Sequence, residues 1–466
     1  MNKKNTIIIT CVFLILTVYG FTMNEQKNKF GKDVFQAQVA GHFYPGTSKN
    51  IIKDLDSFFN KAEMNYSGEE VFALITPHAG YDYSGQTAMD AYKKLYFSLI
   101  LSNKNNYNVI VIGPAHRLYF KGISTLSSSE YQTPLGKVKL DNTELKKYTN
   151  DSAFKDEHSI EVQIPFLQYI FNKANKNLTI TPILLGDINK SETIKIVSEL
   201  IDENTIIIVS SDLSHFNKDK IAREIDKICI NNILSGEEDI DACGEAGINI
   251  LNELVAKDKN IKKEFINYSN SGDVTGDKNS VVGYASFSYY YASSENILIK
   301  LARKAIYDKL SNQKTNKEEI KEIIPKEYLE TKGVFVTLTI NNRLRGCIGN
   351  IIGTSPIYEG VIDNAKNSAF SDPRFNQLTN KELEKTDIEV SILSVPSPCS
   401  LRDIKKNDGV ILEKGSNSAI YLPQVWDQLP SKDEFLGTLC EKAGLEWDCY
   451  NDSKTIFKKF NVEIIK

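Results

Sequence analysis

Three short apolar runs in the first half of the sequence each lead into a segment that carries a histidine. The runs are residues 71–75, 108–112 and 205–209, and the histidines that follow them are His78, His116 and His215. Short runs rich in β-branched residues and closed by glycine, proline or serine predict buried strands. In open α/β sheets, the carboxyl ends of such strands form the edge that binds ligands. Because imidazole binds transition metals and transfers protons near neutral pH, the pattern predicts one of these chemistries there.

The other histidines fall in the same half of the chain. All five lie before residue 216: His42, His78, His116, His158 and His215. His158 has Glu161 three residues later on an expected helix, and His215 has Asp212 three residues earlier. A carboxylate at this spacing can orient an imidazole for proton transfer. We therefore expect His158, His215 and Asp212 to act in catalysis.

A histidine can also cap a helix or satisfy a hydrogen bond in the core, and this structural role is the alternative for each of them. Placement at a strand end favours a functional role for His78 and His116. His42 lies in a turn rich in glycine and proline. For His42 both roles stay open, with the structural one favoured.

The length and charge of the chain limit its class. A chain of 466 residues predicts two or three domains. A net charge of −4 argues against a nucleic-acid partner. Seven cysteines without a C-x-x-C pair do not predict a disulfide-built fold or a zinc finger.

Residues 1–30 are expected to be a leader outside the fold. Lys3 and Lys4 precede an apolar run from Ile7 to Phe21. As a helix this run would span roughly 22 Å, which is short for a hydrocarbon core of about 30 Å. A signal peptide is favoured, an uncleaved membrane anchor is the alternative, and a topology with both domains facing the cytoplasm stays open.

Strands alternate with helical patterns over residues 34–292, which predicts an α/β domain with a mixed sheet covered by helices. From residue 293 the expected secondary structure changes. The sequence predicts a lysine-rich helix, a hairpin with Asn341 and Asn342 at its turn, a further helix and a strand. Residues 293–466 are therefore expected to form a second, α+β domain.

Four blocks of the first domain resemble the Memo-like family, which is similar in fold to class III extradiol dioxygenases. The blocks are Pro77-His78-Ala79-Gly80-Tyr81, Gly113-Pro114-Ala115-His116, Glu157-His158-Ser159-Ile160-Glu161 and Ser210-Ser211-Asp212-Leu213-Ser214-His215. This resemblance implies a metal site formed by His78, His116 and Cys243. Two imidazoles and a thiolate suit iron, with copper or zinc as alternatives. The basic residues that often follow the cysteine in this family are replaced here by Glu245-Ala246-Gly247.

The second domain resembles the AMMECR-type domain. The matching blocks are Leu344-Arg345-Gly346-Cys347-Ile348-Gly349, Asp372-Pro373-Arg374-Phe375, Glu389-Val390-Ser391 and Leu422-Pro423-Gln424-Val425. Arg345 would make the Cys347 thiol reactive if it lowered the thiol pKa, and a packed, inert Cys347 is the favoured alternative.

Together the two resemblances imply a metal-dependent redox enzyme or oxygenase that works with a radical SAM partner. The alternative is a non-catalytic module that binds a small molecule or peptide in the Memo-like cleft and holds a partner through the second domain. The cytosolic setting of radical SAM chemistry conflicts with an exported chain.

Overall fold

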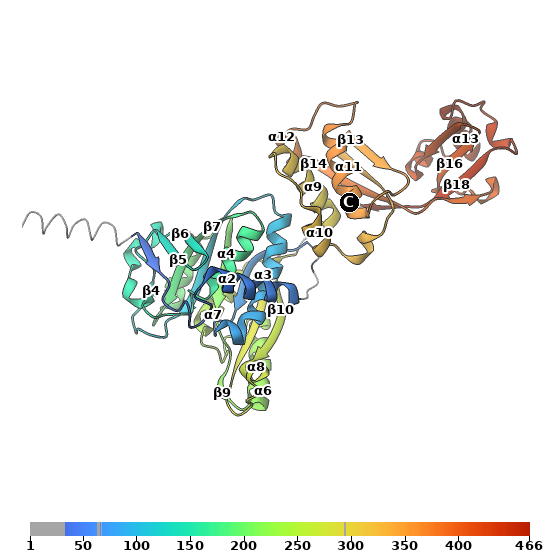
Figure 1. Ribbon diagram of the computed structural model, residues 1–466. Helices are drawn as coiled ribbons and strands as arrows, with labels where there is room; N and C mark the ends of the chain where they lie inside the picture. Colours follow the sequence, from blue (N-terminus) through green and yellow to red (C-terminus); the bar gives the residue numbers. More distant parts are fainter. Residues whose placement is uncertain (1–32, 63–65, 67, 293–294) are drawn as a thin grey trace, which may run out of the picture. The chain divides into compact units, whose positions relative to one another are not determined.

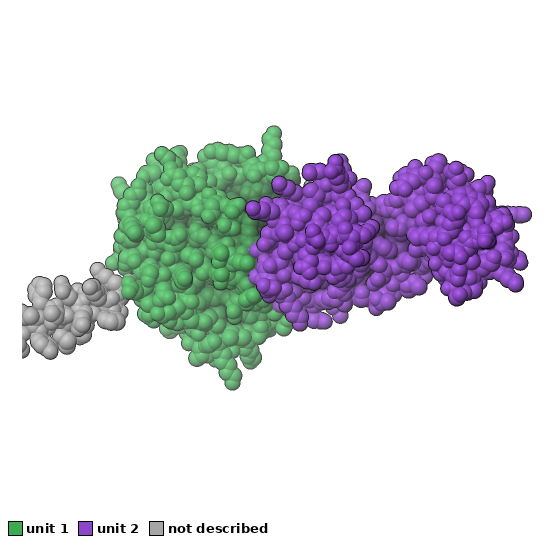
Figure 2. Space-filling view, turned by 90° about the horizontal axis from the view of Figure 1, so that it is seen from above, with its two compact units in different colours: residues 1–64, 69–292 green, residues 65–68, 293–466 purple. Residues whose placement is uncertain are grey.

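The computed structural model describes residues 33–62, 66, 68–292 and 295–466 (Figure 1). The chain forms two compact units, one running to residue 292 and the other from residue 293 with residues 65–68 attached (Figure 2). The expected leader at residues 1–30 lies outside the described residues. No helix in the described part of the chain combines the length and apolar character needed to cross a bilayer.

The first unit is built on one mixed sheet. Its strands are β1 (Val34–Gln36), β2 (Glu70–Thr76), β3 (Asn106–Pro114), β4 (Ile123–Ser124), β5 (Glu130–Thr133), β6 (Gly136–Leu140), β7 (Asn177–Leu185), β8 (Thr205–Ser210), β9 (His215–Asn217), β10 (Ile261–Asn270) and β11 (Val281–Tyr291). They lie in the order β1-β5-β6-β7-β3-β8-β2-β11-β10, with β4 on β7 and β9 on β11. The central strands β7, β3, β8 and β2 run parallel, whereas β11 and β10 are antiparallel.

Helices cover both faces of this sheet, as an α/β domain requires. They are α2 (Ser48–Lys61), α3 (Tyr81–Leu101), α4 (Gln163–Lys173), α5 (Lys190–Glu199), α6 (Asp219–Ser235), α7 (Glu245–Val255) and α8 (Ser271–Thr275). Helix α3 packs on β2, β10 and β11 and against α2 and α4, whereas α7 packs on β3 and β8 and against α5. Alternate residues of β3 point to opposite faces, and Val109, Ile110, Val111 and Ile112 are all buried. The expected fold class is confirmed.

The parallel strands bring distant segments to one edge. Strand β2 ends two residues before His78, and β3 ends two residues before His116. Strand β8 lies between β2 and β3 and ends at Ser210. Because parallel strands all end at the same edge, these three segments lie side by side.

His158 and Glu161 were expected to lie on one helix, but helix α4 begins only at Gln163. Residues 157–162 form an irregular turn instead, so the proposed helical spacing between His158 and Glu161 was wrong. Glu161 is buried, and its carboxylate accepts four hydrogen bonds: from the backbone amides of Gln38 (2.6 Å) and Val39 (2.9 Å) and from the hydroxyls of Tyr44 (2.7 Å) and Tyr131 (2.7 Å). Glu161 thus ties the segment after β1 to this turn.

The second unit contains two four-stranded antiparallel sheets with helices. Its elements are α9 (Ile297–Leu310), α10 (Lys317–Ile323), β12 (Gly333–Ile340), β13 (Arg343–Asn350), α11 (Ile357–Phe370), α12 (Asn380–Leu383), β14 (Thr386–Leu393), β15 (Ser397–Cys399), β16 (Gly409–Lys414), β17 (Asn417–Tyr421), α13 (Lys432–Lys442), β18 (Ile456–Phe460) and β19 (Val462–Ile465). The sheet orders are β13-β12-β14-β19 and β15-β18-β16-β17. Asn341 and Asn342 both have positive φ at the turn between β12 and β13, which confirms the expected hairpin.

Replacing Glu161 with glutamine should destabilise the first unit by about 2–3 kcal/mol, because an amide nitrogen would face backbone N–H donors that need an acceptor. Urea unfolding of the purified protein measures this change. Glu130→Gln is the matched control, since Glu130 contacts only the exposed Lys137 among the ion pairs of this surface and should cost less than about 0.5 kcal/mol. An equal effect of both substitutions would contradict the anchoring role of Glu161.

Candidate metal centre

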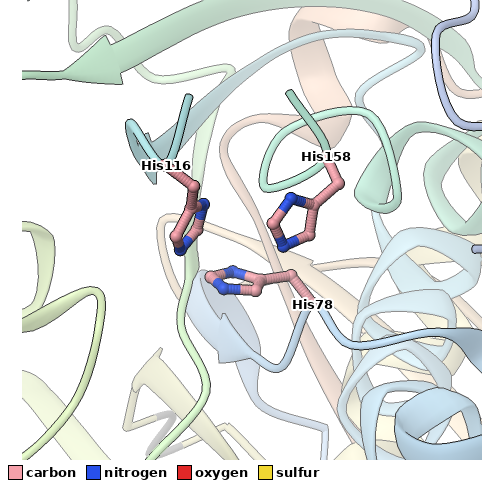
Figure 3. Close-up of side chains that lie close together, drawn as sticks. All are labelled: His78, His116 and His158. Carbon is pink, nitrogen blue, oxygen red and sulfur yellow. The ribbon is translucent and has the colours of Figure 1, made fainter. Parts of the chain in front are cut away.

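Three imidazoles converge at the sheet edge. One nitrogen from each of His78, His116 and His158 lies within 4.8 Å of the others (Figure 3). The ring centroids are 5.1 Å apart for His78 and His116, 5.2 Å for His78 and His158, and 4.6 Å for His116 and His158. Such a group of imidazole nitrogens fits a transition-metal ion.

Ser210 determines which nitrogen of His78 is free. The Ser210 hydroxyl donates its single proton to the Ser159 carbonyl (2.5 Å) and accepts from the Gln163 amide (2.8 Å). Its contact with His78 Nδ1 at 3.0 Å therefore requires His78 Nδ1 to be the donor. The lone pair of His78 is left on Nε2, as metal binding requires.

Glu157 orients the other two imidazoles. Its carboxylate accepts from the backbone amide (2.6 Å) and Nδ1 (3.0 Å) of His116. It also accepts from the backbone amides of His158 (2.8 Å) and Ser159 (2.9 Å), and His158 Nδ1 lies 3.3 Å from the same carboxylate. His116 Nδ1 thus has an acceptor and its Nε2 stays free, which is the arrangement found around metal-bound histidines. His158 Nδ1 is buried near the same carboxylate without a hydrogen bond in the described chain, so Glu157 holds His158 through its backbone amide.

The electrostatics of the cluster keep the Glu157 carboxylate charged and the His78 imidazole neutral. Burial raises the pKa of Glu157, but hydrogen bonds from His116, His158 and backbone amides outweigh it and hold that pKa well below its usual value. The pKa of His78 is lowered well below its usual value by burial and by the neighbouring His158 and His116. His78 is therefore a neutral ligand at neutral pH.

Cys243 lies beside this group. Its Sγ is 3.1 Å from His78 Nε2, the nitrogen that Ser210 leaves free. Burial and the charge of Asp212 raise the pKa of the Cys243 thiol to about 12. In the metal-free protein the thiol therefore donates its proton to His78 Nε2, and a bound cation would have to displace that proton.

His215 and Asp212 lie outside the group of three histidines. His215 is in β9, where it pairs with Val282 of β11. Asp212 is buried and accepts a hydrogen bond at 2.7 Å from the backbone amide of His78. Asp212 therefore positions His78, and within the described chain no hydrogen bond joins its carboxylate to His215. The third histidine of the cluster comes from the turn before α4, not from the third strand end.

Sequence reasoning missed four residues that shape the site: Phe43, Glu157, Gln163 and Ser210. Phe43 stacks on His158 with ring centroids 4.5 Å apart, whereas the neighbouring His42 is exposed. Glu157 and Ser210 were within the quoted blocks, but nothing in their spacing shows which histidine each contacts. A polar residue at a buried strand end was the available signal for Ser210.

In the second unit, Cys347 lies on β13 in an ionic cluster. Its backbone amide donates to Asp372 (2.9 Å), and its Sγ lies 3.3 Å from the Thr337 hydroxyl. Arg345 pairs with Glu382 on α12 (3.0 Å), not with the thiol. Arg374 pairs with Asp372 at 2.7 Å. These contacts make the charged residues of the matching blocks structural pairs around β13.

Comparison with known proteins gives two matches that divide the chain. The family described as "Memo-like protein" matches residues 36–288, and the family described as "AMMECR1" matches residues 299–465. A MEMO1 family protein of Nitrosopumilus maritimus is 34% identical over 278 residues, covering 54% of this chain and 98% of the relative. One from Thermoplasma volcanium is 36% identical over 268 residues, covering 53% and 95%.

A crystal structure of an uncharacterized protein from Pyrococcus horikoshii is also similar in part. It is 38% identical to this chain, with a TM-score of 0.32, and covers 36% of this chain and 88% of its own.

Replacing Glu157 with glutamine should weaken the affinity for a divalent transition metal by about 10–100-fold, because one amide cannot orient two imidazoles as a carboxylate does. Competition with a chromophoric chelator measures the affinity for Zn²⁺ or Co²⁺. Glu144→Gln, at an exposed position of the same unit, serves as the control. Unchanged affinity in a folded Glu157 variant would contradict the orienting role.

Proposed function

The chain belongs to the Memo-like protein family, with an AMMECR1 domain following in the same chain, and we propose that its first domain binds a redox-capable transition-metal ion. The observation that carries this proposal is the convergence of His78, His116 and His158 within 4.8 Å. Each imidazole has its Nδ1 directed at a polar group of the protein, which leaves Nε2 for a metal.

The proposed ligands are the three imidazoles, with the sulfur of Cys243 as a fourth donor beside His78. The family resemblance implies His78, His116 and Cys243, and the geometry adds His158 to that set. Nitrogen with one soft sulfur suits iron, copper or zinc and excludes magnesium and calcium as preferred ions. We propose iron as the resident metal.

Bound iron would supply dioxygen or substrate activation, and the protein would supply position and protons. Asp212 holds the backbone of His78, and Glu157 holds His116 and His158, so the ligands are fixed before any metal binds. His215 is half-buried and close enough to affect the pKa of both His78 and Asp212. We assign His215 as the proton carrier of the site, with His158 freed from that role by its place in the cluster.

Elemental analysis of the leaderless protein, purified anaerobically without chelator, tests the ligand set. The parent should hold close to one metal per chain, and His78→Ala with His116→Ala should remove it. Separate His158→Ala and Cys243→Ala variants decide the remaining ligands, and a thiolate-to-metal absorption band after Co²⁺ loading reports on sulfur directly.

The outcomes of this experiment separate the alternatives. Metal loss in Cys243→Ala with retention in His158→Ala would return the ligand set to the one that the family resemblance implies. The absence of metal from the folded parent and from all folded variants would contradict the metal proposal and favour a non-catalytic binding module.

We also propose that the protein works outside the cytoplasm. Cys440 and Cys449 form a disulfide in the core around α13, and structural disulfides persist in oxidising compartments. The basic residues and apolar run at the start of the sequence supply an export signal or anchor. Such a location separates the chain from a cytosolic radical SAM partner, so export and that partnership exclude each other.

Thiol titration of the denatured protein tests the disulfide and the compartment together. Protein recovered from outside the cytoplasm should show four thiols without reductant, from Cys229, Cys243, Cys347 and Cys399, and a fifth from Cys11 where residues 1–30 are retained. Reduction should expose two more. Replacing Cys440 and Cys449 with serine should cost about 2.5 kcal/mol in unfolding experiments, from loss of the cross-link alone. Full-length protein found only in the cytoplasm with all thiols free would contradict this location.

A further inference from the structure

A cavity of about 390 Å³ opens beside the histidine cluster on the Cys243 side. It is bounded by the ends of β3, β7 and β8, by the start of α7 and by the loop after His116. Its apolar wall is formed by Ile112, Pro114, Leu118, Leu185, Val209 and Ala246. Cys243 belongs to this wall and also contacts His78, so the cavity adjoins the proposed metal position.

The polar groups that line the cavity form an exposed set, here called the outer end, and a more buried set next to His78, here called the inner end. At the outer end, the exposed Tyr119 hydroxyl donates to Asp187 Oδ2 at 3.0 Å. The second oxygen of Asp187 is left to accept from a ligand. At the inner end are Cys243, Ser210 and the first turn of α7. The Glu245 amide of this turn donates to the Ala242 carbonyl, whereas the amides of Ala246 and Gly247 have no partner within the helix.

The charge of the lining is negative or neutral. Among the described residues that line the cavity there is no lysine, arginine or histidine, whereas Asp187 contributes a carboxylate. Glu245 adds a second acid at the first position of α7, next to the lining residue Gly244. The amides of α7 favour an acceptor atom at the inner end, but the described lining residues contribute no basic side chain to balance an anion at the outer end.

We propose that this cavity binds a small molecule with an apolar, ring-sized body and a donor group, neutral or cationic, that hydrogen-bonds to Asp187. An oxygen atom of this molecule, acting as a hydrogen-bond acceptor, occupies the end of the cavity next to Cys243. The charge of Asp187 disfavours ligands that carry a carboxylate or phosphate at the outer end. This assignment deepens the proposed function, because it names the ligand class of the metal site. It rests on the proposed function only for the metal ion expected next to the inner end of the cavity.

Tyramine, tyrosol and 4-hydroxyphenylacetate form a matched probe series, since they share a phenol and differ in an amine, an alcohol or a carboxylate at the far end. Titration of each into the metal-free full chain, followed by saturation-transfer NMR, measures binding. The amine and the alcohol should bind, and the acid should bind at least about tenfold more weakly, because its charge lies near Asp187.

Two variants locate the effect in the cavity. Asp187→Asn keeps the hydrogen bond from Tyr119 and removes the charge, so it should bring the amine and the acid to within about threefold of each other. Ala246→Phe fills the cavity from an exposed position and should abolish binding of all three probes. Ala256→Phe, at the exposed other end of α7, is its matched control and should bind like the parent.

The proposal is overturned if the acid binds as tightly as the amine, or if Ala246→Phe leaves binding unchanged. Loading the chain with paramagnetic Co²⁺ separates this proposal from the metal proposal. Probe binding in the expected order without metal uptake would remove the metal site and keep the cavity assignment. Metal uptake without probe binding would keep the metal site and remove the cavity assignment. Broadening of the phenol resonances on Co²⁺ loading would support both the metal site and the cavity assignment.

Discussion

The carboxylate of Glu157 is the constraint on which the histidine cluster depends. It is almost fully buried, and it accepts hydrogen bonds from His116 and from the backbone of His158 and Ser159. One group therefore holds the end of β3 and the turn before α4 in a single geometry. A buried carboxylate without these donors would be costly, so the turn and the strand end must form together.

The sheet brings the remaining part of the site to that carboxylate. Strand β8 lies between β2 and β3, so its terminal Ser210 reaches His78 on one side and Ser159 on the other. Gly113 permits this approach, since a Cβ there would lie 2.6 Å from the Ser159 hydroxyl. Glu161 anchors the turn from outside through Tyr44 and Tyr131. Two buried carboxylates in one short turn thus connect the sheet edge with the segment that carries Phe43.

Strand ends were predictable from the sequence, whereas contacts across them were not. Apolar runs with Pro or Gly at their ends predicted β2, β3 and β8, and parallel pairing then placed His78 and His116 at one edge. The position of His158 depended on an irregular turn, for which helical periodicity was the wrong assumption, so Glu161 was paired with the wrong residue. His215 followed a strand but entered β9 and paired with β11, because the chain continues past the end of β8. The disulfide joined two cysteines whose spacing carries no signature.

The packing of three imidazoles around one point is itself an argument for a cation. Protonated rings at centroid distances of 4.6–5.2 Å would repel one another, and the neighbouring rings indeed lower the pKa of His78. Neutral rings avoid this repulsion but present lone pairs to a common centre. The proposed metal ion would satisfy those lone pairs, and the charge of Glu157 behind two of the rings would stabilise it. An anionic ligand would meet lone pairs instead of donors at the free ring nitrogens and would be opposed by the charge of Glu157, so the arrangement supports the proposed cation at the centre.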